Sequence, residues 1–286
     1  VVPAADITEV SRVLSWADSQ GLHVVPRGLG TKLDRGARPL SCDVLLDVSA
    51  LDRIVEHSAG DLTVTVQAGV TLAALQATLA LSGQSLALDP PVPGTVGGLV
   101  ATGDSGPMRL RYGGVRDLIL GVLFVRADGT VAKGGGKVVK NVAGYDMPKL
   151  FTGSLGTLGV IVEATFRLYP LPQATRTVSL GELTPREASQ AVARIVNSPI
   201  TPTMLDYYSE GDKGVLGVRL GGSQRSVEVQ SDDARRLLEQ SVLAPGRTMT
   251  LDQEEELAFW ERMDGVVQTG DGDVLVRLIS TPSRLP

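Results

Sequence analysis

Glycine is concentrated in one stretch of this chain, and that concentration constrains the fold more than any other feature. Residues 90–161 contain three glycine motifs: Pro93-Gly94-Thr95-Val96-Gly97-Gly98, Tyr112-Gly113-Gly114-Val115-Arg116-Asp117 and Gly153-Ser154-Leu155-Gly156-Thr157-Leu158-Gly159-Val160-Ile161. Glycine has no Cβ, so it tolerates left-handed backbone and lets the main chain approach another group closely. Because Ser, Thr, Tyr and β-branched residues interleave with these glycines, the pattern indicates ordered backbone lying against a ligand rather than a flexible spacer.

The composition bears on which partners, metal sites and membrane segments can be expected. The chain has 286 residues, of which 43% are hydrophobic and 21% charged, enough for two domains. Its net charge of −5 leaves no broad basic surface, so nucleic acid is not expected as a partner. A single cysteine, Cys42, permits neither an internal disulfide nor a thiolate metal site, so we expect a cytoplasmic protein without a metal. The longest apolar window, residues 70–81, is too short to cross a bilayer, and no transmembrane segment is expected.

The first part of the chain is predicted to alternate helices with short strands. Asp6 and Glu9 stand where a capping box begins a helix that ends at Gly21, and Thr71 is expected to cap a second helix over 72–81. The tract Gly134-Gly135-Gly136-Lys137 is not a Walker loop, because no Ser or Thr follows the lysine, and we interpret it as a flexible loop. Apolar or alternating runs predict strands at 22–26, 44–47, 54–57, 63–67, 118–127 and 162–168.

Pro170 and Pro172 indicate a domain junction, giving domains at 1–172 and 173–286. In the second domain, Thr184, Pro185 and Glu187 form a capping box with proline at the first helical position, which predicts a helix to about Asn197. Further helices are expected near 227–240 and 254–263, and strands at 175–180, 204–208, 215–220 and 274–279. This order of elements is that of a split βαβ, ferredoxin-like sandwich.

The loop Arg27-Gly28-Leu29-Gly30-Thr31-Lys32 follows a predicted strand. Its glycines allow consecutive N–H groups to point at one anion, such as a pyrophosphate. An ordinary glycine turn explains the loop equally well when it is taken alone. It is not a Rossmann fingerprint, because no glycine stands three residues after Gly30 and no helical pattern follows.

Taken in order, this loop and the three glycine motifs resemble the vanillyl-alcohol-oxidase, or PCMH-type, family of FAD-binding domains over residues 1–172. The segment 140–151 is similar, more narrowly, to the FAD-binding subunits of bacterial glycolate oxidase. The resemblance implies an α+β fold: a PCMH-type domain of two α/β subdomains with FAD between them, followed by a ferredoxin-like cap domain over the ring end. The second domain would be truncated, because members of the family commonly continue beyond the last predicted strand.

The resemblance also implies which residues hold FAD. Residues 27–32 would wrap the pyrophosphate, residues 93–105 would line the flavin and ribityl chain, and residues 153–161 would approach by backbone. A flat ring against Gly97 and Gly98 agrees with this, since a Cβ there would collide with it; structural turns are the alternative. The expected cofactor-binding residues are Pro26, Arg27, Gly28, Leu29, Gly30, Thr31, Lys32, Pro93, Gly94, Thr95, Val96, Gly97, Gly98, Ala101, Thr102, Gly103, Ser105, Tyr112, Gly113, Arg116, Asp117, Gly153, Ser154, Gly156, Thr157, Gly159, Val160 and Ile161.

The positions of the two histidines bear on the chemistry. The first glycine loop contains no His, and His23 precedes it in a strand, so we expect FAD to be bound non-covalently. Related 2-hydroxy-acid dehydrogenases carry His residues in the second domain, whereas His23 and His57 both lie in the first. Catalytic residues therefore stay unassigned, with Tyr207, Arg219 and Arg277 as the candidates that could assist hydride transfer.

These observations favour an FAD-binding subunit of a glycolate (2-hydroxy acid) oxidase complex, acting in electron transfer beside a catalytic flavoprotein and an iron-sulfur subunit. Such a subunit would be cytoplasmic, or peripheral to the inner membrane through its partners. The alternatives are a self-sufficient FAD-dependent oxidoreductase acting on a small hydroxylated substrate and a scaffold whose flavin site has decayed.

Overall fold

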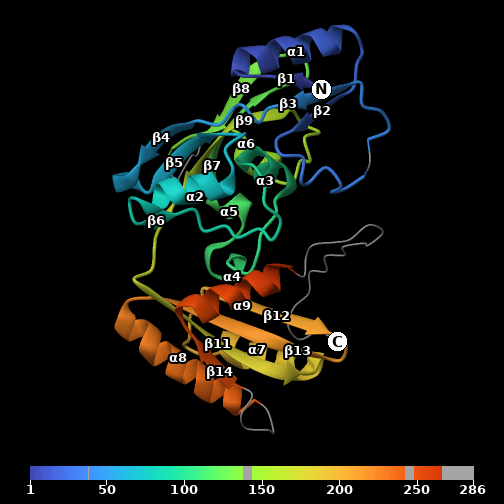
Figure 1. Cartoon of the computed structure of the whole chain (residues 1–286). Coiled ribbons are helices and arrows are strands. Elements are labelled where there is room, and N and C mark those ends of the chain that lie inside the picture. Colours follow the sequence, from blue (N-terminus) through green and yellow to red (C-terminus); the bar gives the residue numbers. More distant parts are fainter. Residues whose placement is uncertain (38, 138–143, 242–247, 266–286) are drawn as a thin grey trace. The chain divides into compact units, whose positions relative to one another are not determined.

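The computed structural model describes residues 1–37, 39–137, 144–241 and 248–265, and it divides into two compact units (Figure 1). Unit 1 comprises Val1–Ser105 and Gly113–Leu171, and unit 2 comprises Gly106–Tyr112 and Pro172–Pro286. The short segment Gly106–Tyr112 thus leaves the glycine-rich stretch and joins unit 2, which the sequence analysis did not anticipate. No helix in the described ranges is long and apolar enough to cross a bilayer.

Unit 1 begins with a three-stranded parallel sheet in the order β1-β3-β2 and one helix, α1 (Ile7–Ser19). Asp6 Oδ1 accepts a hydrogen bond from the Glu9 N–H at 2.8 Å, and Glu9 Oε2 accepts one from the Ala5 N–H at 2.7 Å. The capped helix start predicted from the sequence is therefore confirmed. The strands are β1 (Val2–Pro3), β2 (Val24–Arg27) and β3 (Val44–Asp47).

A five-stranded antiparallel sheet forms the rest of the framework of unit 1, in the order β4-β5-β9-β7-β8. Its strands are β4 (Ile54–Ser58), β5 (Thr63–Gln67), β7 (Ile119–Val125), β8 (Val131–Gly135) and β9 (Val160–Arg167). One apolar cluster joins α1 and β3 to this sheet, since Val10 and Leu46 pack with Val125 and Val162. The two sheets of unit 1 therefore share a core.

Short elements connect these sheets. Thr71 caps α2 by accepting from the Ala74 N–H at 3.2 Å, as predicted. The connecting elements are η1 (Ala59–Asp61), α2 (Leu72–Ala80), α3 (Val96–Thr102), α5 (Val115–Leu118), α6 (Met147–Phe151) and a two-stranded ribbon of β6 (Gln84–Ser85) and β10 (Tyr169–Pro170).

The tract interpreted as a flexible loop from its glycines is instead the end of a strand. Gly134 and Gly135 belong to β8 and pair with Val122 and Gly121 of β7. A Cβ on Gly134 would collide with Met147 at the start of α6, so glycine is required where that helix packs on the strand. The prediction was wrong because three adjacent glycines carry no strand propensity of their own.

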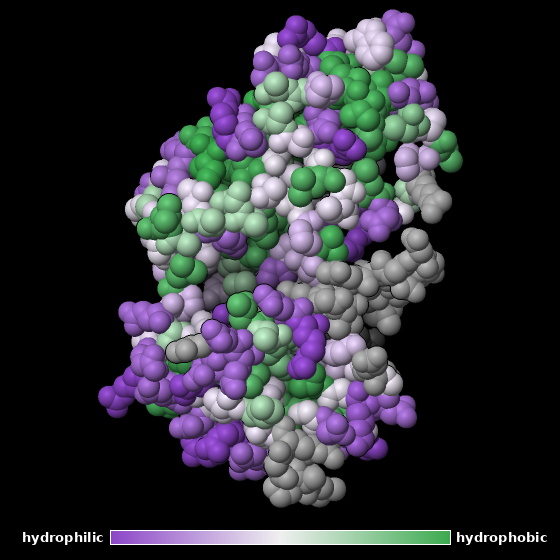
Figure 2. Space-filling view, in the orientation of Figure 1, coloured by the Kyte–Doolittle hydropathy of each residue, from purple (hydrophilic) through white to green (hydrophobic). Residues whose placement is uncertain are grey.

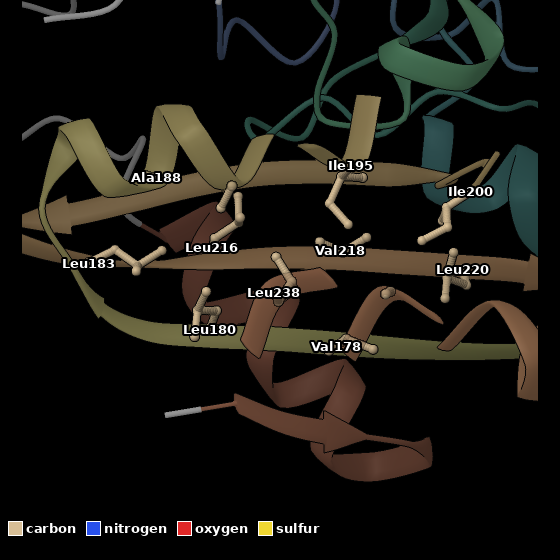
Figure 3. Close-up of a cluster of buried hydrophobic side chains, with 12 residues drawn as sticks. Val178, Leu180, Leu183, Ala188, Ile195, Ile200, Leu216, Val218, Leu220 and Leu238 are labelled. Atoms are coloured by element: carbon tan, nitrogen blue, oxygen red, sulfur yellow. The ribbon is translucent and has the colours of Figure 1, made fainter. Parts of the chain in front are cut away.

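Unit 2 is an antiparallel sheet of order β12-β13-β11-β14. Its elements follow the chain as β11 (Ala174–Leu183), α7 (Pro185–Val196), β12 (Met204–Glu210), β13 (Lys213–Gly222), α8 (Gln224–Glu239), β14 (Thr248–Leu251) and α9 (Gln253–Gly265). Figure 3 shows side chains of β11 and β13 directed toward α7 and α8, with Val178, Leu216 and Leu238 in one buried cluster. The βαββαβ order and the strand order together confirm the ferredoxin-like fold class.

The fourth strand of this sheet precedes α9 and was not predicted. β14 pairs with β11 over only four residues, and of these Leu251 alone is buried. Thr248-Met249-Thr250-Leu251 does alternate polar and apolar residues, but four residues are the shortest run by which a strand is recognised. The strand expected at 274–279 lies outside the described residues.

The second face of the sheet in unit 2 carries α9 and the segment Gly106–Tyr112, which contains α4 (Arg109–Tyr112). Met108 packs against a buried cluster that includes Met204, Phe259, Trp260 and Met263. The Met108 side chain is half-buried against this cluster, which explains why the segment belongs to unit 2.

Candidate cofactor site

A cavity of about 400 Å³ opens in unit 1 where segments distant in the sequence meet. This is the size range of small-molecule sites, roughly 300 to 1,000 Å³. A smaller cavity of about 70 Å³ shares part of its wall. The main cavity is lined by Val24, Val25, Pro26, Arg27, Gly28, Leu29, Gly30, Thr31, Lys32, Leu33, Arg35, Ala37, Pro39, Gly94, Thr95, Gly98, Ala101, Thr102, Leu155, Gly156 and Thr157.

The loop that follows β2 forms the first wall and is fastened to the second. Thr31 Oγ1 donates to the Pro93 carbonyl at 2.6 Å, and Lys32 Nζ donates to the Val92 carbonyl at 2.8 Å. A Cβ on Gly28 would lie 2.7 Å from Thr95 Cγ2, so glycine lets the loop rest directly on the start of α3. The two loops thus form one continuous surface.

Helix α3 supplies the second wall. Thr95 caps it by accepting from the Gly98 N–H at 3.3 Å, and Val96, Leu99 and Val100 are buried beneath it. The two adjacent glycines differ: a Cβ on Gly97 would lie 2.8 Å from Ala68 Cβ, whereas a Cβ on Gly98 would meet only Thr95 Oγ1, at 3.4 Å. Packing within the protein therefore requires Gly97, and Gly98 borders the main cavity with space beside it.

The third wall is the loop that precedes β9. The Gly153 and Leu155 N–H groups donate to the Val100 and Ala101 carbonyls at 2.9 and 2.7 Å, which ties this loop to α3. Gly156 has φ +76° and faces Pro26, and a Cβ added at this glycine would lie 3.1 Å from Pro26 Cγ. Ser154 Oγ is buried and has no hydrogen-bond partner among the described residues. Leu155, Gly156 and Thr157 of this loop line the cavity, and the loop also contains one buried polar atom without a partner.

The charged groups at the cavity are largely paired. Arg27 Nη2 and Nε donate to Asp47 Oδ2 at 2.9 and 3.2 Å. Hydrogen bonds from Ser49, and then the Arg27 guanidinium, hold the pKa of Asp47 below its ordinary value. Lys32 Nζ lies 2.7 Å from Asp104 Oδ2, and both side chains are more than nine-tenths buried. The two ion pairs anchor the loop after β2 at both of its ends.

Several known proteins are similar to this chain in sequence or in fold. A family model described as an FAD binding domain matches residues 1–135. The chain is 34% identical over 250 residues to glycolate oxidase subunit GlcE of Escherichia coli, covering 86% of this chain and 68% of that protein. This chain belongs to the family of FAD-binding oxidoreductases that includes the glycolate oxidase subunits.

Other members of the family are longer than this chain. It is 34% identical to glycolate oxidase subunit GlcD of Bacillus subtilis over 73% of this chain and 45% of that protein. It is also 34% identical to a D-lactate dehydrogenase of Archaeoglobus fulgidus, over 72% of this chain and 46% of that protein. The chain thus spans less than half of either relative. A solved alkyldihydroxyacetonephosphate synthase superimposes with a TM-score of 0.78 at 21% identity, over 93% of this chain and 54% of that one, and shows the shared fold.

FAD is the cofactor of this family, and the cavity fits it. Its walls supply glycine backbone and apolar side chains suited to ring systems. Hydrophobic side chains reach the surface of unit 1 in several places, interspersed with polar ones (Figure 2). Leu29, Leu33 and Leu155 are exposed and line this cavity.

The structure brings many of the predicted site residues together and leaves others apart. Those that line the main cavity are Pro26, Arg27, Gly28, Leu29, Gly30, Thr31, Lys32, Gly94, Thr95, Gly98, Ala101, Thr102, Gly156 and Thr157. Those that line only the smaller cavity are Gly97, Gly159, Val160 and Ile161. Those that line neither are Pro93, Val96, Gly103, Ser105, Tyr112, Gly113, Arg116, Asp117, Gly153 and Ser154.

The Tyr-Gly-x-x-x-Asp motif has a local structural role. Asp117 Oδ2 accepts from the Gly114 N–H at 2.9 Å and so caps α5. Gly113 has φ +81°, and a Cβ there would lie 2.6 Å from Asp117 Cβ, so the turn requires glycine. Tyr112 belongs to unit 2. The motif therefore shapes the turn that returns the chain to unit 1.

Sequence reasoning missed the segment after the first loop. Leu33, Arg35, Ala37 and Pro39 line the main cavity, and Val24 and Val25 extend it along β2. These residues form no motif, and only their position directly after the glycine loop could have indicated them.

The candidates for assisting catalysis have structural partners. Tyr207 Oη donates to the Leu183 carbonyl at 2.9 Å, and Arg219 Nε donates to Glu256 Oε1 at 3.0 Å. Arg277 lies outside the described residues. Of the histidines, His23 bonds to Asp43 at 3.0 Å and His57 to Gln84 at 2.9 Å, and neither lines the cavity. Within the described ranges no group of His, Cys, Asp and Glu is placed to hold a metal ion.

Proposed function

We propose that this chain is the FAD-binding subunit of a glycolate (2-hydroxy acid) oxidase complex and acts in electron transfer beside a catalytic flavoprotein and an iron-sulfur subunit. The observation that carries the proposal is its 34% identity to GlcE over 68% of that protein, together with the cavity in unit 1. Bound FAD would supply the two-electron redox chemistry that such a complex needs.

The residues at the cavity would bind and orient the cofactor. Side-chain hydrogen bonds from Thr31 and Lys32 join the loops after β2 and before α3, and the Gly98 face leaves room for a flat ring. The Arg27–Asp47 and Lys32–Asp104 pairs hold these loops, so little ordering would be needed on binding.

Attachment of FAD would be non-covalent. The described residues that line the main cavity include no His, Cys or Tyr that could form a bond to the flavin. Acid precipitation of the purified protein tests this: we expect FAD in the supernatant, and yellow colour left in the pellet would contradict it.

An accessory role is favoured over independent catalysis. Tyr207 and Arg219 donate hydrogen bonds to the Leu183 carbonyl and to the buried Glu256 carboxylate within unit 2, which are contacts typical of structural side chains. The second candidate function is a self-sufficient FAD-dependent oxidoreductase, which the 34% identity to a D-lactate dehydrogenase favours.

Anaerobic mixing of the purified flavoprotein with glycolate or D-lactate separates the two functions. The accessory role predicts no bleaching of the flavin by either acid until a partner flavoprotein is added. Rapid bleaching with the isolated chain would reject that role and support the second candidate.

Cell fractionation tests the expected location, which is the cytoplasm or the inner membrane surface when partner subunits are present.

A further inference from the structure

The cations that line the main cavity within the described residues are Arg27, Lys32 and Arg35, and they differ in what they already bind. Arg27 makes two hydrogen bonds to Asp47, at 2.9 and 3.2 Å. Lys32 makes one to Asp104 at 2.7 Å and one to the Val92 carbonyl at 2.8 Å. Both positive charges are therefore neutralised at hydrogen-bond distance.

Lys32 is committed to this arrangement by its burial. Its side chain is 5% exposed and that of Asp104 is 7% exposed. Separating such a pair would leave a buried charge without a partner, and this free-energy penalty would exceed the gain from a new contact. Lys32 was expected to bind the pyrophosphate, but its position fits a structural role beneath the loop.

Arg35 is different. Its nearest carboxylate is Asp104, at 3.9 Å from Nη2, and that carboxylate is already bonded to Lys32. The backbone N–H of Arg35 donates to the Lys32 carbonyl at 3.2 Å, which fixes the position of the residue. The side chain is 29% exposed. At 3.9 Å the contact with Asp104 is too long for a hydrogen bond, and the guanidinium makes no hydrogen bond to any described residue. A guanidinium fork with open donors matches the paired oxygens of a phosphate.

We propose that Arg35 is the cation that contacts the diphosphate of FAD, while the Lys32–Asp104 pair positions the loop beneath it. The inference rests on the proposed FAD site and adds a residue that no motif of the chain contains. On binding, the guanidinium exchanges its long contact with Asp104 for charge-assisted hydrogen bonds to phosphate oxygens.

The test compares ligands with and without phosphate on R35Q. We expect Arg35→Gln to weaken FAD and ADP about ten- to a hundredfold, because charge-assisted hydrogen bonds are lost. Riboflavin and adenosine, which carry no phosphate, should bind the variant and the wild type within about twofold of each other. Arg126→Gln is the matched control, since Arg126 pairs with Asp128 on a hairpin and does not line the cavity; it should leave all four affinities unchanged.

A second variant separates charge from geometry. Arg35→Lys keeps the positive charge but not the fork, so its loss of FAD affinity should be smaller than that of R35Q and should grow with salt concentration. Circular dichroism of both variants checks the fold.

Three outcomes would overturn the inference. R35Q with wild-type affinity for FAD and ADP would remove the role of Arg35 and leave the proposed function intact. Equal losses for riboflavin and FAD would show that the substitution distorts the loop. Wild-type protein that binds neither FAD nor ADP would overturn both the proposed function and this inference.

Discussion

The polar cluster on the sheet of unit 2 and the polar walls of the cavity in unit 1 differ in how fully their groups are paired. In unit 2, the buried Glu256 carboxylate accepts from Thr175 and Thr177 at 2.6 and 2.8 Å and from Arg219 at 3.0 Å. In unit 1, Arg35 lines the cavity and has only a long contact, with Asp104, while Ser154 Oγ on the loop before β9 has no partner among the described residues. A saturated cluster adds rigidity, whereas unsatisfied donors and acceptors are available to a ligand. We therefore interpret the Glu256 cluster as a structural element of unit 2 and the unpaired polar groups of unit 1 as groups available to a ligand.

The largest effect on stability is expected for the buried Lys32–Asp104 ion pair of unit 1, in which each charge already has its partner. Asp104→Ala should lower the free energy of unfolding by about 3 kcal/mol and release FAD, because it leaves Lys32 buried without a counterion. The double variant Lys32→Met with Asp104→Leu should recover most of that stability, since well-packed apolar side chains can replace a buried pair. Thermal unfolding and flavin content measure both. A double variant no more stable than the single one would mean that the pair does not act as a unit.

Glu256→Ala tests the saturated cluster of unit 2. Removal of the carboxylate leaves Arg219, Thr175 and Thr177 without their acceptor and should cost about 2 kcal/mol of stability, less than the Asp104 change because Arg219 is 31% exposed. Urea unfolding followed by fluorescence reports the loss, since Trp260 donates to Thr177 in this cluster at 2.8 Å.

The matched control is Glu261→Gln, an exposed position on the same helix. FAD affinity of the folded protein should not change in either variant. A Glu256→Ala protein that is fully stable but loses flavin would contradict the division of roles.

The adjacent glycines of α3 provide a finer test. Gly97→Ala should lower stability by about 1 to 3 kcal/mol, because its Cβ would lie 2.8 Å from Ala68 Cβ. Gly98→Ala should leave stability unchanged or slightly higher, since alanine favours a helix, and should weaken FAD by narrowing the cavity. Differential scanning calorimetry and FAD titration distinguish the two. Similar losses of stability in both variants would show that Gly98 also serves packing.

The smallest effect concerns Glu163 on β9. Burial raises the pKa of this carboxyl above its ordinary value, against smaller opposing effects of Lys133 and Arg53. The folded state therefore holds the proton more tightly, and stability is lost as the pH rises from the ordinary pKa through the raised one.

Glu163→Gln should consequently be more stable than the wild type at pH 7 by about 0.5 kcal/mol or less. The advantage should vanish near pH 3, well below the ordinary pKa of glutamate, where the wild-type carboxyl is protonated in both states. Unfolding curves at the two pH values check this, and a constant difference between them would exclude titration of Glu163 as the cause.

Local patterns in the sequence determined much of the secondary structure. The caps at Asp6, Thr71 and Thr184 each begin the helix they predict, because a side chain and a backbone N–H three residues on are enough to form them. β3 and β5 have the bounds expected from their apolar patterns. α3 was missed, since Val96-Gly97-Gly98 has poor helix propensity and forms a helix through packing and its Thr95 cap.

The sequence alone therefore predicted the capped helices, the β-α-β-β-α order from β11 to α8 of unit 2 and the glycine loops at the cavity, but not α3, β8 or the edge strand β14. The tertiary structure decided which of two adjacent glycines faces the cavity, which cations are neutralised, and that Met108 joins unit 2. The physical reason is separation along the chain. Lys32 and Asp104, or Gly97 and Ala68, meet only after the sheets have formed, so no local pattern around either residue specifies its partner.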